Sequence, residues 1–374
     1  MKKLRAGIVG CGGIANAKHL PAMEKCGLYE VVAFCDIIPE QAQETKEKFG
    51  SSDAKVFTDY RELVKEDLDV VYVTTPNRSH SEISIAAMEA GKDVMCEKPM
   101  ARTYAETEKM LETAKRTGRV LNIAYQNRYR PDSTYLKEMC KNGEMGDIYF
   151  AKAHALRRRA VPTWGVFLNE EEQGGGPLID IGTHALDLTL WMMDNYEVAS
   201  VTGAVFHKLS QQTDQGNAFG NWDPEQFKVE DSAFGFIRMK NGALIELESA
   251  WALNTLDVDE AKTSICGTKA GADMKDGLRI NRIHHNTQTV EIPDLSGGGV
   301  AFFAGEEKSA ADVEQELFYH IVVDGQEQIV KPEQAAVVTA FLKRYTVQQR
   351  AERQFTLIEG KGDYGGKKIK TAAV

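Results

Sequence analysis

The sequence predicts an α/β fold with two domains: a doubly wound parallel sheet, then an α+β domain with an open, mostly antiparallel sheet. Three observations support this prediction. Apolar runs alternate with helix-sized amphipathic segments over the first third of the chain, which is typical of a parallel sheet covered on both faces. After residue 125, short strand-like runs follow one another with turns between them. The length of 374 residues also favours two cores over one.

The elements of the first domain follow this alternation in chain order. We expect strands at 4–9, 31–35, 56–57, 70–74, 93–96 and 120–124, and helices at 39–49, 59–64, 79–90 and 104–117. The strands are nearly continuous apolar runs, as buried parallel strands are. The first domain is therefore expected to span residues 1–125.

The second domain is expected to span residues 126–355. Helices are predicted at 133–142, 182–193 and 332–349, and strands at 148–156, 198–206, 232–239, 243–250, 263–266, 277–280 and 289–292. Asn241-Gly242 is a strong two-residue hairpin signal between two of these strands. The remainder, 356–374, is rich in glycine and lysine and is expected to be a disordered tail.

The turn after the first strand carries a cofactor signature. Its residues fit G-x-G-x-x-A, the dinucleotide-binding turn of the Rossmann fold: Gly10, Cys11, Gly12, Gly13, Ile14 and Ala15. Gly10 permits the tight turn and Gly12 lets the backbone approach a pyrophosphate, which then lies at a helix N-terminus. An ordinary βα turn is the alternative for a glycine motif alone. The preceding strand and the acid Asp36, at the spacing expected for ribose binding, favour the dinucleotide.

Asp36 also indicates which dinucleotide is bound. A carboxylate at this point repels a 2′-phosphate, and Ile37, Ile38 and Pro39 supply no arginine to bind one. We therefore expect NAD as the cofactor, with NADP as the alternative.

Polar side chains follow three further strands of the first domain, at strand ends that are expected to meet the cofactor, because an open α/β sheet binds its ligands there. Thr75, Asn77 and His80 follow one strand, Glu97 and Lys98 the next, and Asn127 and Arg128 the last. A proline turn with a helix cap would also explain the first segment. Lys98 between an acid and a proline is harder to explain structurally, because charged residues are seldom placed at buried strand ends without a partner or a function.

Charge and cysteine content exclude several functions. The net charge of −10 argues against a nucleic-acid partner. The six cysteines show no C-x-x-C pair and no metal-ligand spacing, so no metal site is expected, and reduced thiols favour a cytoplasmic location. No apolar stretch is long enough to span a membrane, so no membrane association is expected.

The motifs together resemble the Gfo/Idh/MocA family, which includes glucose–fructose oxidoreductase and inositol dehydrogenase. The resemblance rests on the glycine turn, Asp36, Thr74–His80 (TTPNRSH), Cys96–Pro99 (CEKP) and the later segment GGGPLIDIGTHALDL. It implies a homo-oligomer, a dimer or tetramer, in which the open sheet often forms the contact. It also implies that Lys98 of E-K-P and Asp180 and His184 of D-x-x-x-H are the catalytic residues.

The residue types fit oxidation of a secondary alcohol. His184, with an ordinary pKa near ~6.5, could remove the hydroxyl proton close to neutral pH. Lys98 could bind the same oxygen and stabilise the developing alkoxide. Asp180 could orient substrate hydroxyls. Without the resemblance, a buried core histidine is the more ordinary explanation of His184.

The expected substrate is a sugar, glycoside or inositol ring, bound by polar side chains and an apolar wall. Candidate substrate-binding residues are Lys98, Arg128, His154, Arg157, Arg158, Trp164, Asp180, His184 and Trp251. Trp164 and Trp251 could equally be core anchors. The run Arg157–Arg159 could bind a substrate carboxylate or phosphate, contact the cofactor, or pair with Glu170–Glu172.

Two other functions remain open on the same scaffold. One is a non-catalytic sensor of sugars or dinucleotides, although a sensor has no need for the set Lys98, Asp180 and His184. The other is an enzyme that uses bound NAD for transient oxidation during glycoside cleavage or epimerisation. Tightly bound NAD without net reduction would indicate the second alternative.

Overall fold

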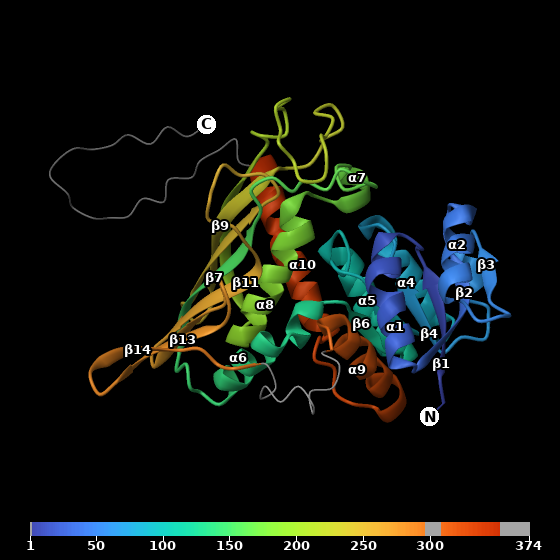
Figure 1. Cartoon of the computed structure of the whole chain (residues 1–374), viewed down its shortest axis with the longest axis horizontal. Helices are drawn as coiled ribbons and strands as arrows, with labels where there is room; N and C mark the ends of the chain where they lie inside the picture. The colour runs from blue at the N-terminus through green and yellow to red at the C-terminus, as the bar shows by residue number, and fades with distance from the viewer. Residues whose placement is uncertain (1, 296–307, 352–374) are drawn as a thin grey trace.

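The computed structural model describes residues 2–295 and 308–351. It contains two sheets that lie side by side, with helices α8 (Thr183–Met193) and α10 (Pro332–Ala351) between the larger sheet and the first domain (Figure 1). The predicted tail 356–374 lies outside the described residues, as does the end of the predicted second domain.

The first sheet has six parallel strands in the order β3-β2-β1-β4-β5-β6, which confirms the predicted doubly wound fold. The strands are β1 (Leu4–Val9), β2 (Tyr29–Cys35), β3 (Lys55–Phe57), β4 (Val70–Val73), β5 (Asp93–Cys96) and β6 (Leu121–Ile123). The helical segments are η1 (Ala15–His19), α1 (Leu20–Cys26), α2 (Pro39–Phe49), α3 (Tyr60–Leu63), η2 (Asn77–Ser79), α4 (His80–Glu89) and α5 (Tyr104–Thr117). Strand order reverses between β1 and β4, which opens a crevice at their carboxyl ends.

The loops after β1 and β4 approach closely at Gly10. Its φ is +95°, and a Cβ at this position would lie 2.7 Å from the carbonyl of Thr74. The Thr74 hydroxyl also donates to the Gly10 carbonyl at 2.6 Å. Glycine is therefore required here both by backbone conformation and by space.

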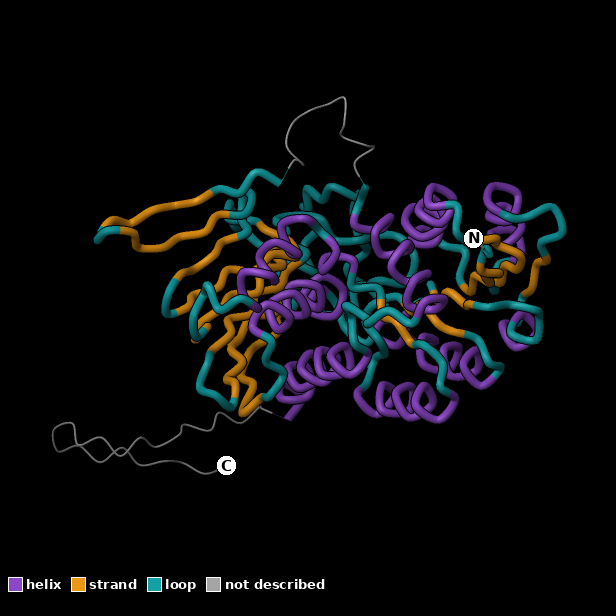
Figure 2. The backbone as a smooth tube through the Cα atoms, turned by 90° about the horizontal axis from the view of Figure 1, so that it is seen from below, coloured by secondary structure: helices purple, strands orange, loops and turns teal. Residues whose placement is uncertain are grey.

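The second sheet has eight strands in the order β14-β13-β12-β11-β7-β10-β9-β8. They are β7 (Ile148–Leu156), β8 (Val198–Phe206), β9 (Ser232–Met239), β10 (Leu244–Ala250), β11 (Asp259–Gly267), β12 (Ala270–Asp273), β13 (Arg279–His284) and β14 (Thr287–Glu291). All pairs are antiparallel except β7 with β10, so the predicted mostly antiparallel sheet is confirmed. Figure 2 shows these strands at the end of the molecule opposite the first domain.

Two details of this sheet bear on the sequence predictions. The predicted hairpin is confirmed, because antiparallel β9 and β10 flank Asn241-Gly242, and Gly242 has a φ of +92°. The predicted two-residue turn is wrong: the Met239 N–H donates to the carbonyl of Ala243, which leaves three residues between them. The strand expected at 277–280 overlaps only the first two residues of β13, and β12 was not predicted. The sequence of β12, Ala-Gly-Ala-Asp, contains no β-branched or aromatic residue that would have indicated a strand.

The other helical segments of the second half are η3 (Gln126–Tyr129), α6 (Pro131–Lys141), α7 (Glu170–Gln173), η4 (Leu178–Gly182) and α9 (Ala310–Asp324). Among the helices in 2–295 and 308–351, none has the length and apolar character needed to cross a bilayer.

Helix α9, which was not predicted, returns to the first domain. Gln315 on α9 accepts hydrogen bonds from Tyr29 through its carbonyl (2.7 Å) and from Tyr72 through its side chain (2.6 Å). A capping box formed by Ser309 and Asp312 begins the helix. This S-x-x-D pattern was the available sequence signal. Residues far apart in sequence thus complete the core beneath β1 and β4.

The substrate-binding role predicted for Arg128 is wrong. Its side chain is fully buried and pairs with Asp187 of α8 through two hydrogen bonds of 2.9 and 2.6 Å. It also donates to the carbonyl of Ile329 and to the side chain of Gln334 on α10. Arg128 therefore joins η3, α8 and α10 inside the protein and is not available to a substrate.

Candidate active site

The glycine turn forms an open cradle at the end of β1. A helical run from Gly13 to Cys26 begins directly after the turn. Nothing lies within 4 Å of where a Cβ of Gly12 or Gly13 would be, so space for a ligand remains above the backbone. Helix N-termini present free N–H groups that favour anions. The turn therefore fits a pyrophosphate.

Asp36 lies at the end of β2, beside this turn. Its carboxylate accepts hydrogen bonds from the backbone N–H groups of Cys11 (2.8 Å) and Ile38 (2.9 Å), which fix its orientation. Ile14, Ile37 and Ile38 are exposed around it, with 41%, 87% and 45% of their surface accessible. An acid flanked by exposed apolar side chains fits the ribose and base of an adenosine.

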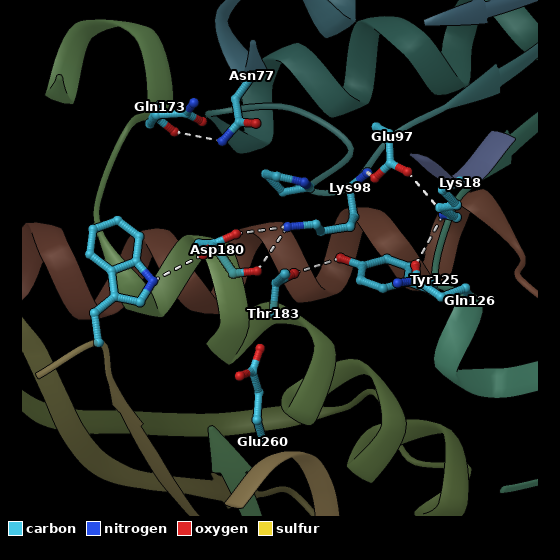
Figure 3. Close-up of polar contacts among 12 residues, drawn as sticks. Lys18, Asn77, Glu97, Lys98, Tyr125, Gln126, Gln173, Asp180, Thr183 and Glu260 are labelled. Atoms are coloured by element: carbon cyan, nitrogen blue, oxygen red, sulfur yellow. Dashed lines mark hydrogen bonds and ion pairs between the residues drawn. The ribbon is translucent and has the colours of Figure 1, made fainter. Parts of the chain in front are cut away.

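The loop after β4 forms the other wall of the crevice. Asn77 donates to the carbonyl of Gln173 at 2.9 Å, which connects this loop to the second domain (Figure 3). The Thr75 hydroxyl is buried and has no hydrogen-bond partner among the described residues. His80 is fully buried between the carbonyls of Thr75 and Pro99. The structure therefore favours a positioning role for His80 over the cofactor contact expected from the sequence.

Lys98 and Asp180 meet where the two domains face each other. The Lys98 ammonium donates to the carboxylate of Asp180 at 3.0 Å and to its carbonyl at 2.9 Å (Figure 3). The second carboxylate oxygen of Asp180 accepts from the Trp251 indole at 2.9 Å. Burial raises the pKa of Asp180, but the charges of Lys98 and Arg157 outweigh burial and lower it below its ordinary value. Asp180 is thus a fixed carboxylate.

His184 lies in the first turn of α8, next to this pair. It is 8% exposed, and its Nδ1 has no hydrogen-bond partner among the described residues. Its ring packs edge-on against Tyr125, whose hydroxyl lies 2.8 Å from that of Thr183. An orphaned buried ring nitrogen is costly in a purely structural histidine, so this group is suited to a ligand.

The protonation of His184 differs from the expectation. Burial, followed by the charge of Lys98, lowers the pKa of His184 to about 3. The expectation that it titrates near neutral pH is therefore wrong for the ligand-free protein. The imidazole is neutral near pH 7, and its low pKa makes it a weak base in the ligand-free protein.

A buried cluster of charged side chains holds the backbone of Lys98 in place. The Glu97 carboxylate accepts from the backbone N–H of Lys98 (3.0 Å), from Lys18 (2.9 Å) and from the His19 ring (2.8 Å). Lys18 also pairs with Glu314 of α9 at 3.1 Å. Burial raises the pKa of Glu97, but Lys18 and the bond from His19 hold it well below its ordinary value. The structure thus favours a positioning role for Glu97 over direct cofactor contact.

Sequence reasoning missed Lys18 and Glu314, and no local motif pointed to them. Lys18 follows the glycine turn on η1, whereas Glu314 comes from the unpredicted helix α9. Asn127, a predicted cofactor residue, is half-buried in η3, beside Gln126, whose side chain accepts from Lys18 at 3.1 Å (Figure 3). Its contact with the cofactor stays a prediction.

The other candidate substrate-binding residues fall into two groups, those beside Asp180 and those away from it. Arg157 forms two hydrogen bonds of 2.5 and 2.6 Å with Glu260, not with Glu170–Glu172. His154 lies on the sheet between Glu248 and Ser264. Trp164 is 52% exposed, whereas Trp251 is fully buried. The structure therefore places Arg157 and Trp251 beside Asp180 and leaves Trp164 facing solvent.

Glu230 holds the loop that precedes Asp180. Its buried carboxylate accepts from the backbone N–H groups of Gly176 (2.9 Å) and Leu178 (3.3 Å). A Cβ at Gly176 would lie 2.2 Å from the carbonyl of Glu230, so only glycine fits so close to this residue. Glu230 therefore positions the start of η4, the segment that carries Asp180.

We expect Glu230 to make stability depend on pH. Burial raises its pKa from 4.5 to about 7, so the folded protein binds this proton more tightly than the unfolded chain. The contribution is fully present below about pH 4.5 and is lost as the pH rises through about 7. Relative to Glu230→Gln, the wild type should therefore lose roughly 3 kcal/mol of unfolding free energy between pH 4.5 and 8.

Urea unfolding of both proteins across this range measures the difference. Because both retain His184, its opposite pH dependence cancels. Glu225→Gln, an exposed change in the same segment, is the matched control and should track the wild type. A pH-independent difference between wild type and Glu230→Gln would contradict the assignment.

Comparison with known proteins agrees with this geometry. The model described as an oxidoreductase family with an NAD-binding Rossmann fold matches residues 4–125, and the GFO/IDH/MocA C-terminal domain model matches residues 134–273. The chain belongs to the Gfo/Idh/MocA oxidoreductase family. The predicted family, fold class and NAD cofactor, and the prediction of a dehydrogenase, are confirmed.

Individual relatives of this Gfo/Idh/MocA protein extend the comparison. It is 43% identical over 272 residues to the D-glucoside 3-dehydrogenase of Escherichia coli, an alignment that covers 72% of this chain and 77% of the relative. Its fold resembles an oxidoreductase domain protein from Kribbella flavida (TM-score 0.82, 23% identity, 95% and 98% covered). It also resembles levoglucosan dehydrogenase in complex with NADH (TM-score 0.79, 20% identity, 94% and 98% covered).

Proposed function

We propose that this chain is an NAD-dependent dehydrogenase that oxidises a secondary ring hydroxyl of a D-glucoside. The observation that carries the proposal is the placement of Lys98, bound to Asp180 and next to the neutral imidazole of His184, where the dinucleotide crevice meets the second domain. Similarity to a D-glucoside 3-dehydrogenase supports glucosides as the substrate class and C3 as the first position to test.

Each side chain has a separate task in this proposal. Bound NAD supplies the hydride acceptor, the nicotinamide ring. The Lys98 ammonium donates a hydrogen bond to the reacting hydroxyl oxygen and stabilises its developing negative charge. The neutral His184 imidazole accepts the hydroxyl proton, because the negative charge that develops on the substrate oxygen beside it raises the pKa of the imidazole. Asp180, fixed by Trp251, orients Lys98 and accepts hydrogen bonds from neighbouring sugar hydroxyls.

A rate screen tests the proposal. NADH formation is measured with NAD and methyl D-glucosides, free glucose, levoglucosan and myo-inositol. We expect the highest kcat/KM among these substrates with a glucoside. Preference for inositol or a free sugar would overturn the substrate class. Tightly retained NAD without net NADH formation would indicate transient oxidation instead.

Asp36 should determine the choice of dinucleotide. In Asp36→Asn the negative charge is lost while the shape is kept, so the ribose loses a charge-assisted hydrogen bond and a 2′-phosphate is no longer repelled. The ratio of kcat/KM for NAD to that for NADP should fall about 10- to 100-fold. Initial rates with both cofactors measure it, with the exposed change Asp53→Asn as control. An unchanged ratio would remove Asp36 from cofactor selection.

We also propose that the chain is a homo-oligomer that pairs through the second sheet. Phe206, Phe234 and Phe236 gather on strands β8 and β9, and Phe236 is 48% exposed. The β13–β14 hairpin projects from the body (Figure 1) and exposes Ile283 and Val290 at 62% and 64%. Such an apolar surface fits a second copy. Light scattering after size exclusion would detect a monomer if this is wrong.

The cytoplasmic location remains a proposal as well. It is supported by the six cysteines, all of which are free and three of which are buried. Free buried thiols are typical of proteins in reducing compartments.

A further inference from the structure

Two aromatic side chains face solvent on neighbouring loops of the second domain. Trp164 is 52% exposed and Phe219 is 46% exposed. Their ring centroids are 4.9 Å apart and their planes are perpendicular. We call this pair the aromatic shelf. Adjacent aromatic side chains that expose a contiguous apolar surface to water are typical of binding sites.

The aromatic shelf connects to the candidate active site through a row of rings. Trp164 packs edge-on against Phe167 at 5.8 Å between centroids, and Phe167 packs against Trp251 at 6.3 Å. The Trp251 indole is the group that donates to Asp180. The shelf is therefore the outer end of an aromatic wall whose inner end contacts the proposed catalytic carboxylate.

The shelf is also held in place by hydrogen bonds between its two loops. The Asn217 side chain accepts from the Val161 N–H at 2.8 Å and donates to the Val161 carbonyl at 3.0 Å. The Thr163 hydroxyl donates to the carbonyl of Phe219 at 2.5 Å. These bonds fix Trp164 and Phe219 relative to each other before any ligand binds, which lowers the entropic cost of binding.

Polar groups border the shelf. Arg159 donates to the side chain of Asn254 (2.5 Å) and to the carbonyl of Gln215 (3.1 Å), and Arg158 beside it is exposed. Apolar ring faces with hydrogen-bonding groups at their edge match a ring that has flat apolar faces and a polar rim. A flat apolar patch without such a rim would favour a protein partner instead.

We propose that the aromatic shelf is a second subsite, which binds the ring attached through the glycosidic bond of the substrate. The shared chemistry is a flat ring with an apolar face, either a second pyranose or an aryl group. This inference rests on the proposed function, because it assumes that the oxidised glucose ring lies at Lys98 and Asp180. The proposed function does not define the group attached to the oxidised glucose ring, and this inference identifies its chemical class.

Kinetics of Trp164→Ala and Phe219→Ala test the subsite. Three substrates are compared in both anomeric forms: methyl glucoside, 4-nitrophenyl glucoside and a methyl glycoside of a glucose disaccharide. We expect KM to rise about tenfold for a substrate with a second ring and to stay within about twofold for methyl glucoside. Tyr104→Ala, an equally exposed aromatic on α5 (44%), is the control and should change none of the three.

The outcomes distinguish an aryl group from a second sugar as the bound ring, and failure of the subsite from failure of the proposed function. A rise for the aryl glucoside alone identifies an aryl group, and a rise for the disaccharide alone identifies a second sugar. Equal KM changes for all three substrates, or none, would overturn the subsite. If no glucoside is oxidised, the proposed function fails. Calorimetry in the presence of NAD then still tests the subsite. It shows whether Trp164→Ala weakens the binding of 4-nitrophenyl glucoside more than the binding of methyl glucoside.

Discussion

Replacing Lys98 with methionine should lower kcat at least about 10³-fold while NAD binds with nearly unchanged affinity. Methionine keeps the apolar stem and removes the ammonium that lies 3.0 Å from the Asp180 carboxylate. The developing charge on the substrate oxygen would then lose its nearest donor. Steady-state kinetics measure the rate, and calorimetry measures NAD binding.

The control for Lys98→Met is Lys109→Met, an exposed lysine on α5, which should leave both quantities unchanged. Arginine at position 98 keeps the charge but changes its geometry, so Lys98→Arg should recover only part of the activity. Turnover within tenfold of the wild type in Lys98→Met would contradict the assignment of Lys98.

The buried ion pair of Arg128 and Asp187 should contribute the largest single-site effect on stability. Both side chains are at most 1% exposed. Removing one partner in Asp187→Asn or Arg128→Met leaves the other without its buried counter-charge, so the free energy of unfolding should fall by about 3–5 kcal/mol. Urea unfolding measures this loss.

The double change Arg128→Met with Asp187→Leu distinguishes the charge effect from lost packing. Because neither charge then remains, much of the lost stability should return. Lys141→Met, which removes an exposed ion pair with Glu138, should leave the unfolding midpoint unchanged. If the two single changes and the double change cost the same, the pair contributes through shape and not through charge.

The sequence predicted the first domain well because its signals are local. A tight turn that needs Gly10, apolar strands and the acid Asp36 each occupy a few adjacent residues, and the structure has all of them. Lys98 and Asp180 could be selected from short motifs for the same reason. That the two touch could not be derived from spacing, since 82 residues separate them.

What the sequence could not show depends on long-range packing. The charge of Arg128 and its position after a strand suggested a ligand-binding residue. Only the fold reveals that Asp187 neutralises this charge. The pKa of His184 is displaced because α8 buries it near Lys98. Glu314 reaches the support of Lys98 only because α9 returns to the first domain. None of these contacts leaves a periodic or spacing signal in the sequence.

Direct transfer of deuterium tests the central claim, that a hydride leaves a ring carbon of a glucoside under the control of Lys98. Methyl glucosides deuterated at single ring carbons are incubated with NAD, and the NADH formed is analysed by mass spectrometry. We expect deuterium in NADH from one secondary ring carbon only, with C3 expected, and labelled NADH should form at least about 10³-fold more slowly with Lys98→Met. Absence of label from every ring position, or an equal rate of labelled NADH formation with Lys98→Met, would contradict this claim.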